Sequence, residues 1–259
     1  MPETIPSQPE TDAPSDRAPD AVWSMADPHF HEGDPALGTF FAWLEAFRRS
    51  GTPDLVLLGD LFRVWVGLPG AQGREQREVL GALGALASEG RRVVYVVGNR
   101  DYFAEEAGRA AGMLVSEGWE RTVGGRRVRF EHGDLINTSD RQYLMWREFS
   151  RSRGVLGLVR SLPDRRKMAL ARWLEARMAD TNASYRDYEP RGEIRRWSSR
   201  LAAEGVSLAV VGHFHREAQW LVNGMEVLLL PQFRRSGRHL RLAGDGVARI
   251  VDGTGDGES

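Results

Sequence analysis

Five short polar motifs stand in a fixed order along the chain, and they contain most of its candidate metal ligands. They are Asp27-Pro28-His29, Gly59-Asp60, Gly98-Asn99-Arg100-Asp101, His132-Gly133-Asp134 and Gly212-His213-Phe214-His215. Four of the six histidines fall inside these motifs. Together the motifs supply seven candidate ligands, namely Asp27, His29, Asp60, Asn99, His132, His213 and His215. Carboxylate, carboxamide and imidazole groups in this number are what a two-metal phosphoester hydrolase requires.

The ligand types restrict the ion. The chain has no cysteine, which excludes thiolate ligands and disulfides. Oxygen ligands mixed with imidazole suit Mn²⁺, Fe or Zn better than Ca²⁺. Asp60, at the end of a buried apolar run, suits the carboxylate that bridges two cations about 3.5 to 4 Å apart. Such a pair would generate a bridging hydroxide and neutralise a phosphoryl oxygen, so the predicted chemistry is hydrolysis without a protein nucleophile.

Each motif follows a short apolar run that is typical of a strand. The runs are Val22 to Ala26, Leu55 to Leu58, Val93 to Val97, Val128 to Glu131 and Leu208 to Val211. In open α/β sheets, ligands bind beyond the carboxyl ends of the strands, where loops from distant parts of the sequence converge. Taken singly, an Asp-x-His, His-x-His or Gly-Asp motif is more often an ordinary loop or turn than a metal site. Five motifs in order, each after a strand, favour one shared site.

The remaining patterns supply the elements that position these motifs. Helices are predicted over Pro35 to Arg49 and Glu75 to Ser88, and a hairpin over Val115 to Glu131 with Gly124-Gly125 at its centre. Further strands are predicted over Ala218 to Val222, Glu226 to Leu230, Leu240 to Ala243 and Ala248 to Val251, with Asn223-Gly224 as a two-residue turn. The alternation predicts an α/β (α+β) sandwich of sheets flanked by helices.

Residues 141–203 have few strand signals and several helical ones, broken at Gly154, Pro163 and Pro190. We therefore expect one domain over residues 21–252 with an inserted helical cap at about 141–203. Residues 1–20 are rich in Pro, Ser, Thr and acids and lack the features of a signal peptide, so they are expected to be a disordered tail, and residues 253–259 a polar tail. No run approaches the roughly 18 apolar residues of a membrane span, so we expect a soluble or at most peripheral protein.

The net charge of -1 hides an uneven distribution. Residues 141–200 contain 15 Lys and Arg against 7 Asp and Glu. This segment is either built to meet anions or is a solvated, arginine-rich helical face. Its apolar side chains likewise either shelter a ligand or pack the helices onto the core. Nucleic acid is not an expected partner, because no recognised motif accompanies the basic segment and the rest of the chain is acidic.

With these motifs the sequence resembles the calcineurin-like metallophosphoesterase superfamily, from about Val22 to Val251. More narrowly, it is similar to the bacterial UDP-2,3-diacylglucosamine diphosphatases of lipid A synthesis. That likeness rests on three stretches: Gly59-Asp60-Leu61-Phe62-Arg63-Val64-Trp65-Val66-Gly67, Gly98-Asn99-Arg100-Asp101-Tyr102, and His132-Gly133-Asp134 followed by Thr138, Asp140 and Tyr143. The position of the helical insertion agrees with this subgroup.

The resemblance implies a function and a role for each site residue. One metal would be held by Asp27, His29, Asp60 and His215, and the other by Asp60, Asn99, His132 and His213, with Mn²⁺ the expected ion. The catalytic residues would be Asp60, Asn99, Arg100 and Asp101, and the substrate contacts Asn99, Arg100, Asp140 and Tyr143. The reaction would split UDP-2,3-diacylglucosamine into UMP and 2,3-diacylglucosamine 1-phosphate. The cap would shelter the acyl chains, and its basic face would meet the diphosphate or an anionic membrane. The expected location is cytoplasmic, with peripheral contact with the inner membrane as an option.

Arg100 stands where many superfamily members have histidine. An arginine does not deliver a proton near neutral pH, so it stabilises charge rather than acting as a general acid. This suits a diphosphate substrate, whose nucleotide monophosphate leaves readily without protonation.

Three departures from the subgroup concern the substrate rather than the metals. Arg63 replaces an acidic residue, Val66-Gly67-Leu68-Pro69 lacks an acidic pair, and Pro231-Gln232-Phe233-Arg234-Arg235 replaces a Gly-x-Trp-His stretch. A related hydrolase of another nucleotide diphosphate or of a phosphodiester is therefore the alternative. A non-catalytic binding module is a further class, but a scaffold has no reason to retain all seven ligands. His31 and His239 lie outside the pattern and are expected to be ordinary loop or surface residues.

Overall fold

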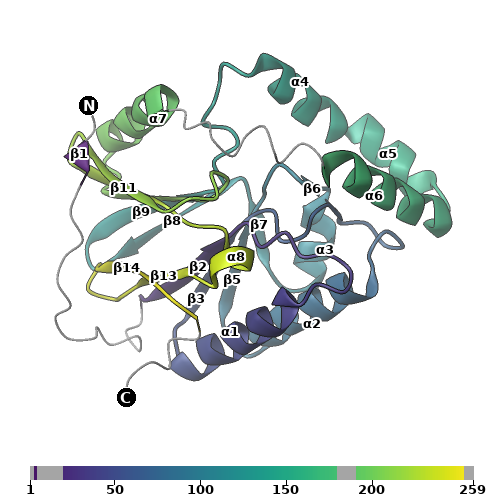
Figure 1. The fold of residues 1–259 in the computed structure, drawn as a ribbon, viewed down its shortest axis with the longest axis horizontal. Coiled ribbons are helices and arrows are strands. Elements are labelled where there is room, and N and C mark those ends of the chain that lie inside the picture. Colours follow the sequence, from purple (N-terminus) through teal and green to yellow (C-terminus); the bar gives the residue numbers. More distant parts are fainter. Residues whose placement is uncertain (1–2, 5–19, 180–190, 254–259) are drawn as a thin grey trace.

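Two six-stranded sheets pack face to face in the computed structural model, which describes residues 3–4, 20–179 and 191–253 (Figure 1). The first sheet has the order β14 (Ala248–Val251), β13 (His239–Leu242), β2 (Val22–Ala26), β3 (Asp54–Leu58), β5 (Arg92–Val96), β7 (Leu114–Ser116). The second has the order β1 (Glu3–Thr4), β11 (Ala218–Val222), β12 (Met225–Leu229), β10 (Leu208–Val211), β9 (Arg126–Glu131), β8 (Gly118–Val123). The short strands β4 (Trp65–Val66) and β6 (Asp101–Tyr102) form a separate pair.

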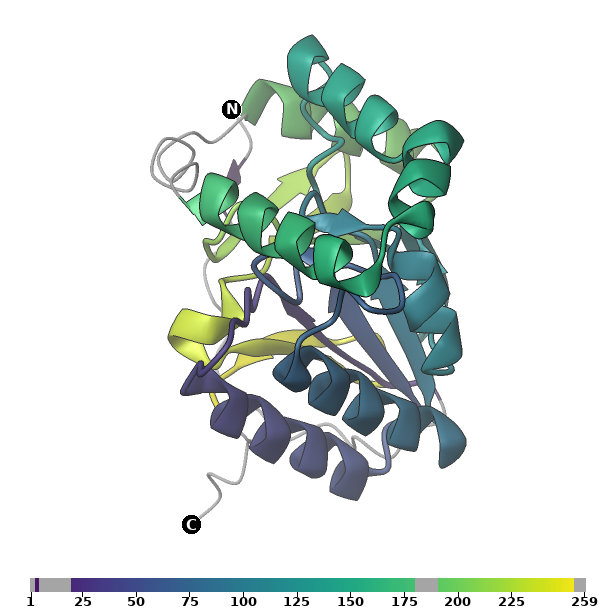
Figure 2. The same cartoon turned by 90° about the vertical axis from the view of Figure 1, so that its right-hand side faces the viewer.

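Helices cover the outer faces of both sheets. On the first sheet lie α1 (Ala36–Ser50), α2 (Arg74–Ser88) and α3 (Ala104–Ala110), and on the second lies α7 (Arg191–Ala203) (Figures 1 and 2). In α1 the buried residues Phe40, Trp43, Leu44 and Phe47 recur every three or four positions. This spacing places them on one helix face, which packs on the sheet. The helix ends at Gly51, whose φ of 79° suits glycine.

The central strands β2, β3 and β5 of the first sheet are buried on both faces. In β2, Trp23 and Met25 face the helices, while Val22 and Ala26 face the second sheet. Because successive side chains of a strand point to opposite faces, one apolar strand contributes to two cores. The sandwich of α/β layers predicted from the sequence is confirmed.

The parallel parts of the two sheets bring the motif loops to one edge. Strands β2, β3 and β5 are parallel, with Ala26, Leu58 and Val96 in register. Strands β9 and β10 are also parallel, with Glu131 opposite Val211. All five motifs therefore begin where these strands end.

The helices of the cap region do not form a single unit. The three helices α4 (Arg141–Ser150), α5 (Arg153–Ser161) and α6 (Asp164–Ala179) lie together beside β6 (Figures 1 and 2). Apolar residues of α5 and α6, including Val159 and Leu174, pack against Val66, Leu68 and Tyr102. By contrast, α7 packs on β11 and β12, although it lies within the range predicted as cap. Residues 180–190 of that range lie outside the described residues.

Most predicted strands and helices agree with the structure to within a residue, but two details were wrong. Val115 and Ser116 do not belong to the predicted hairpin, because they form part of β7 and pair with β5 in the first sheet. The helix break predicted at Gly154 lies at Ser152, whose side chain accepts a hydrogen bond from Val155 N and caps α5.

The ends of the chain are described only in part. Within the predicted N-terminal tail, Glu3–Thr4 pairs with β11, and residues 1–2 and 5–19 lie outside the described residues, as do residues 254–259 of the C-terminal tail. Among the helices of the described chain, none has both the length and the apolar character needed to cross a membrane.

Candidate metal centre

The loops after the strands hold five of the seven candidate ligands in an unusual backbone conformation. Among the described residues, seven non-glycine residues have a positive φ, and five of these are Asp27, His29, Asp60, His213 and His215, with φ between 48° and 65°. Residues other than glycine rarely adopt this left-handed backbone conformation. Strained backbone conformations are most frequent at functional sites. Here all five strained residues are candidate ligands, and their side chains lie close together.

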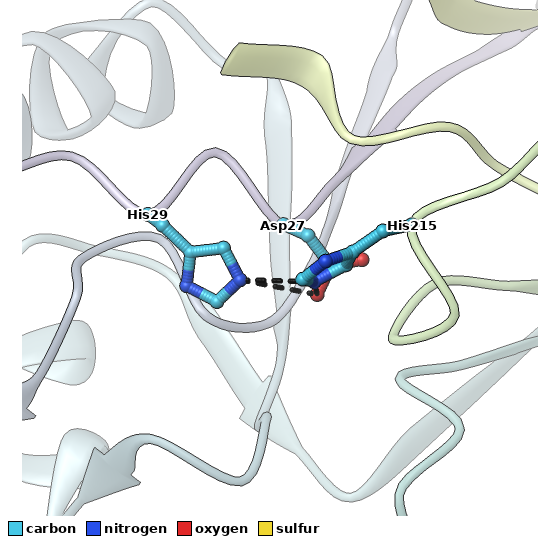
Figure 3. Close-up of side chains that lie close together, drawn as sticks. All are labelled: Asp27, His29 and His215. Atoms are coloured by element: carbon cyan, nitrogen blue, oxygen red, sulfur yellow. Dashed lines mark hydrogen bonds and ion pairs between the residues drawn. The ribbon is translucent and has the colours of Figure 1, made fainter. Parts of the chain in front are cut away.

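Asp27, His29 and His215 form the first cluster (Figure 3). The Nε2 atoms of His29 and His215 lie 3.1 Å apart. Asp27 Oδ1 lies 3.6 Å from His215 Nε2 and 3.9 Å from His29 Nε2. The facing atoms come from the ends of β2 and β10, so each sheet contributes to the cluster.

Asn99, His132 and His213 form the second cluster. Asn99 Oδ1 lies 3.0 Å from His132 Nε2 and 3.1 Å from His213 Nδ1. The Nδ1 of His132 donates to the carbonyl of Leu58 at 2.8 Å. This bond orients the ring so that Nε2 faces Asn99 and His213 and is the nitrogen that can bind a cation, which is the usual arrangement of a metal-binding histidine.

Asp60 lies between the two clusters. Its Oδ2 is 3.9 Å from His29 Nδ1, and its Oδ1 is 3.8 Å from His132 Nε2. One oxygen thus faces His132 of the second cluster and the other faces the His29 ring of the first, so Asp60 lies beside both, where the bridging role predicted for it requires it. Asp27 also approaches both clusters, since its ligand atoms group with those of Asp60 and His132 as well as with those of His29 and His215.

Asp101 lies behind the ligands and holds two of their loops together. Its Oδ2 accepts hydrogen bonds from the main-chain N–H of Gly98 at 2.7 Å and of Asp60 at 3.1 Å, and from the hydroxyl of Tyr95 at 2.7 Å. The loops also touch through glycines, because a Cβ added to Gly59 would lie 2.6 Å from the Cα of Gly98. Asp101, predicted as catalytic, thus contacts the ligand loops rather than the ligand atoms.

Burial and mutual charge perturb the titration of the cluster. Burial raises the pKa of Asp60 to about 7. Burial alone would lower the pKa of His132, but the carboxylates of Asp60 and Asp27 outweigh it and raise that pKa to about 9. Burial, helped by the charge of His132, lowers the pKa of His213 to about 4. Burial also holds the pKa of His29 well below its usual value. His29 and His213 are thus held in the neutral form that binds divalent cations, whereas His132 must release a proton when a cation binds.

Buried polar atoms without hydrogen-bond partners show whether the candidate ligands suit a metal ion. Within the part of the chain that the structure describes, Asp27 Oδ1 and His29 Nδ1 are buried without a hydrogen-bond partner. Buried polar atoms are normally satisfied, and leaving them unpaired costs free energy. Asp27 Oδ1 faces the nitrogens of the first cluster, whereas His29 Nδ1 lies on the far side of its ring from Nε2 and faces Asp60 Oδ2. The unpaired carboxylate oxygen of Asp27 therefore fits a bound cation.

The predicted substrate contacts lie on the Asn99 loop and at the start of α4. The main-chain N–H of Arg100 donates to Asp60 Oδ1 at 2.8 Å, and its Nη1 donates to the carbonyl of Met178 in α6 at 3.2 Å. Asp140 caps α4 by accepting from Tyr143 N at 2.9 Å. The hydroxyl of Tyr143 donates to Asp134.

Sequence reasoning gave no role to several residues that surround the ligands. Tyr95, Arg147 and Arg151 all donate hydrogen bonds to ligand loops or to their carboxylates. Their partners are 6 to 53 residues away in the chain, so no local pattern marks them. The two unassigned histidines have structural partners: His31 contacts Arg234 and Asp34, and His239 is buried rather than exposed as expected.

Comparison with known proteins shows the family of the chain. The calcineurin-like phosphoesterase family matches residues 21–217. A UDP-2,3-diacylglucosamine hydrolase of Azotobacter vinelandii is 31% identical over 232 residues, covering 86% of this chain and 94% of the relative. One from Pseudomonas savastanoi is 33% identical over 200 residues, covering 75% and 79%. A hypothetical protein of Pyrococcus horikoshii shares the fold, with 11% identity, a TM-score of 0.50 and coverage of 90% and 87%. The chain therefore belongs to the calcineurin-like phosphoesterase family and is a metal-dependent phosphoester hydrolase.

Proposed function

We propose that the protein hydrolyses the diphosphate of UDP-2,3-diacylglucosamine, giving UMP and 2,3-diacylglucosamine 1-phosphate. The observation that carries this proposal is the gathering of the seven candidate metal ligands beside a cap that exposes apolar side chains among arginines. Relatives about 30% identical over most of their length are named UDP-2,3-diacylglucosamine hydrolase, which supports the same substrate.

In this proposal the two clusters hold two divalent cations. Asp27, His29 and His215 would hold one ion, Asn99, His132 and His213 the other, and Asp60 would bridge them. Oxygen and imidazole donors suit Mn²⁺ best, with Fe or Zn as alternatives. When bound, the ions supply Lewis-acid activation of water and of the phosphoryl oxygen.

The residues around the centre orient the reacting groups. Asn99 would contact both an ion and the substrate phosphate. Arg100 would stabilise the charge that develops on the diphosphate, since its guanidinium is buried beside Asp60, with Nε 3.6 Å from Asp60 Oδ2. Asp101 would act through the loops it holds. Asp140, the N-cap of α4, and Tyr143, in its first turn, would touch the sugar-diphosphate of the substrate.

The cap provides surface for the acyl chains. Met145, Phe149, Leu158 and Trp173 are 59% to 71% exposed, although they are large apolar residues. Exposed apolar residues that gather in one region are typical of a binding surface. Arg165, Arg166 and Arg172 of α6 place positive charge in the same region. We infer that the cap binds the acyl chains and contacts the anionic face of the inner membrane peripherally.

A direct assay tests the proposal. Purified protein is incubated with Mn²⁺ and UDP-2,3-diacylglucosamine, and UMP and the lipid sugar phosphate are separated and measured. We expect equal amounts of the two products and no reaction in excess chelator. Turnover of bis(p-nitrophenyl) phosphate without release of UMP would overturn the substrate and favour the alternative, a hydrolase of another nucleotide diphosphate or of a phosphodiester. The main-chain N–H of Arg63 donates to the carbonyl of Phe30, next to the candidate ligand His29. Arg63 is therefore a residue that would change the substrate specificity.

A further inference from the structure

One face of α4 is attached to the loops that carry the ligands of the second cluster. Nη2 of Arg151 donates to the carbonyl of Gly98 at 2.6 Å, and Gly98 precedes the candidate ligand Asn99. The hydroxyl of Tyr143 donates to Asp134, two residues beyond the candidate ligand His132. Each of the two loops is thus held by a separate side chain from the cap.

A third residue strengthens the attachment. Nε of Arg147 donates to the same oxygen of Asp134 at 3.0 Å, and its Nη2 pairs with Glu117. Tyr143, Arg147 and Arg151 are spaced by four residues, so they form one stripe along the helix and its C-cap. The exposed residues Met145 and Phe149 lie outside this stripe. One face of α4 therefore meets the metal loops, while other positions remain available to a ligand.

The polar atoms of the Arg151 side chain are unevenly paired. Of the polar atoms in its side chain, Nε and Nη1 are buried and lack a hydrogen-bond partner in the described structure. Burying donors without partners is unfavourable. The side chain nevertheless reaches the Gly98 carbonyl, which suggests that holding the Asn99 loop outweighs this cost.

We propose that Tyr143, Arg147 and Arg151 are positioning residues that fix the Asn99 and His132 loops, so that α4 sets the metal affinity of the second cluster. The proposal rests on the metal centre of the proposed function but not on its substrate. It gives the cap two roles, because the stripe on α4 serves the metal and the exposed apolar residues serve the substrate. Groups that orient metal ligands from outside typically change metal affinity by about 10- to 100-fold when removed.

Calorimetric titration of the metal-free protein with Mn²⁺ tests this inference. Arg151→Met removes the bond to Gly98, and Tyr143→Phe removes only the hydroxyl that contacts Asp134. We expect each variant to bind Mn²⁺ roughly 10- to 100-fold more weakly at one of its two sites, with the other site little changed. Arg151→Lys keeps a charged donor and should recover part of the affinity. Arg141→Met is the matched control, since Arg141 is an exposed arginine of the same helix, and should titrate like the wild type.

Hydrolysis of bis(p-nitrophenyl) phosphate separates positioning from substrate contact. For Arg151→Met and Tyr143→Phe we expect lower kcat at limiting Mn²⁺, recovery in excess Mn²⁺, and unchanged KM. Wild-type Mn²⁺ affinity in a folded Tyr143→Phe protein would overturn the proposal, and a raised KM for the acylated UDP-sugar alongside it would leave Tyr143 with only the substrate contact of the proposed function. If Arg151→Met does not fold, Tyr143→Phe decides. Because the titration needs no substrate, failure of the wild type to release UMP would refute the proposed function and leave this test intact.

Discussion

The main-chain N–H of His213 donates to Oδ2 of Asp27 at 2.6 Å, which joins the first and fifth motifs across the two sheets. The other oxygen of Asp27, Oδ1, faces His215. One carboxylate therefore holds a loop and offers a metal ligand. In Asp27→Asn, a carbonyl oxygen can still accept from His213, but the anionic oxygen is lost. We expect this variant to fold and to lose Mn²⁺ binding at the first cluster.

Asp27→Ala should be less stable than Asp27→Asn. The alanine leaves the His213 N–H buried without an acceptor, at a cost of about 1 to 3 kcal/mol. Urea unfolding of the two metal-free variants measures this difference, and Mn²⁺ titration measures the loss of binding. Two intact Mn²⁺ sites in Asp27→Asn would exclude Asp27 as a ligand.

Substitution of Asp60 tests the bridge between the two clusters. Asp60→Ala removes both oxygens, whereas Asp60→Asn keeps an acceptor for the Arg100 N–H. Loss of Lewis-acid stabilisation worth several kcal/mol should lower hydrolysis of bis(p-nitrophenyl) phosphate by roughly three orders of magnitude in both. Metal content, measured on the same samples, should fall below two ions per chain. An active variant that retains both ions would refute the dinuclear arrangement.

Gly98 should not tolerate a side chain. A Cβ at this position would lie 2.6 Å from Asp60 N, so the Asn99 or Asp60 loop must shift. We expect Gly98→Ala to weaken Mn²⁺ binding and to lower the thermal midpoint. The matched control is Gly81→Ala in α2, where no atom lies within 4 Å of the added carbon. That change should raise stability by about 0.5 to 1 kcal/mol, because alanine is the better helix former. Equal behaviour of the two variants would contradict the close approach of the loops.

The order of strands and motifs was predictable because it depends on local patterns. Apolar runs of strand length end just before the motifs that contain Asp27, Asp60 and Asn99. Parallel pairing of the strands then brings these motifs to one edge of the sheet. Local patterns did not reveal which sheet receives a strand. Val115 and Ser116 continue an apolar run toward the hairpin, yet they pair with β5, because the chain passes from one sheet to the other just before Gly118.

The backbone conformation of the ligands and the groups behind them were not predictable. A positive φ at His29 or His213 does not follow from the residue type, because histidine adopts it more often than most residues but still only in a small minority of cases. The bond from Arg151 to Gly98 likewise joins residues 53 positions apart. His239 was expected on a loop or the surface, but it lies between two tryptophans from distant elements. In each case tertiary contacts decide what the local sequence leaves open.

His239 should make the protein sensitive to acid. Its ring is fully buried and packs against Trp23 and Trp43, with centroids 4.9 and 5.5 Å away, and its Nε2 faces Nε of Arg241 at 3.3 Å. Burial, together with the charge of Arg241, lowers its pKa to about 3. The unfolded chain binds a proton near pH 6.5, so this residue stabilises the fold above that pH and destabilises it as the pH falls further.

The expected size follows from this difference in proton binding. At pH 5 the loss from His239 should be about 2 kcal/mol, because each pH unit below 6.5 costs about 1.4 kcal/mol. Urea unfolding at pH 7.5 and pH 5, in the presence of chelator so that metal release plays no part, measures it. Between pH 7.5 and pH 5, the free energy of unfolding should fall by about 2 kcal/mol more in the wild type than in His239→Gln. Equal losses would show that His239 is not the sensitive group.

The exposed apolar residues of the cap should matter for the acylated substrate alone. Phe149 and Trp173 are 62% and 59% exposed, and covering such a side chain with an acyl chain is worth about 1.5 to 3 kcal/mol. We therefore expect Phe149→Ser and Trp173→Ser to raise KM for UDP-2,3-diacylglucosamine about 10-fold or more, with KM for bis(p-nitrophenyl) phosphate unchanged. Leu114→Ser removes a similarly exposed apolar side chain from β7, outside the cap, and should leave both values alone. If the cap variants and Leu114→Ser behave alike, the exposed residues of the cap do not bind the acyl chains, and the alternative substrates become the better explanation of the metal centre.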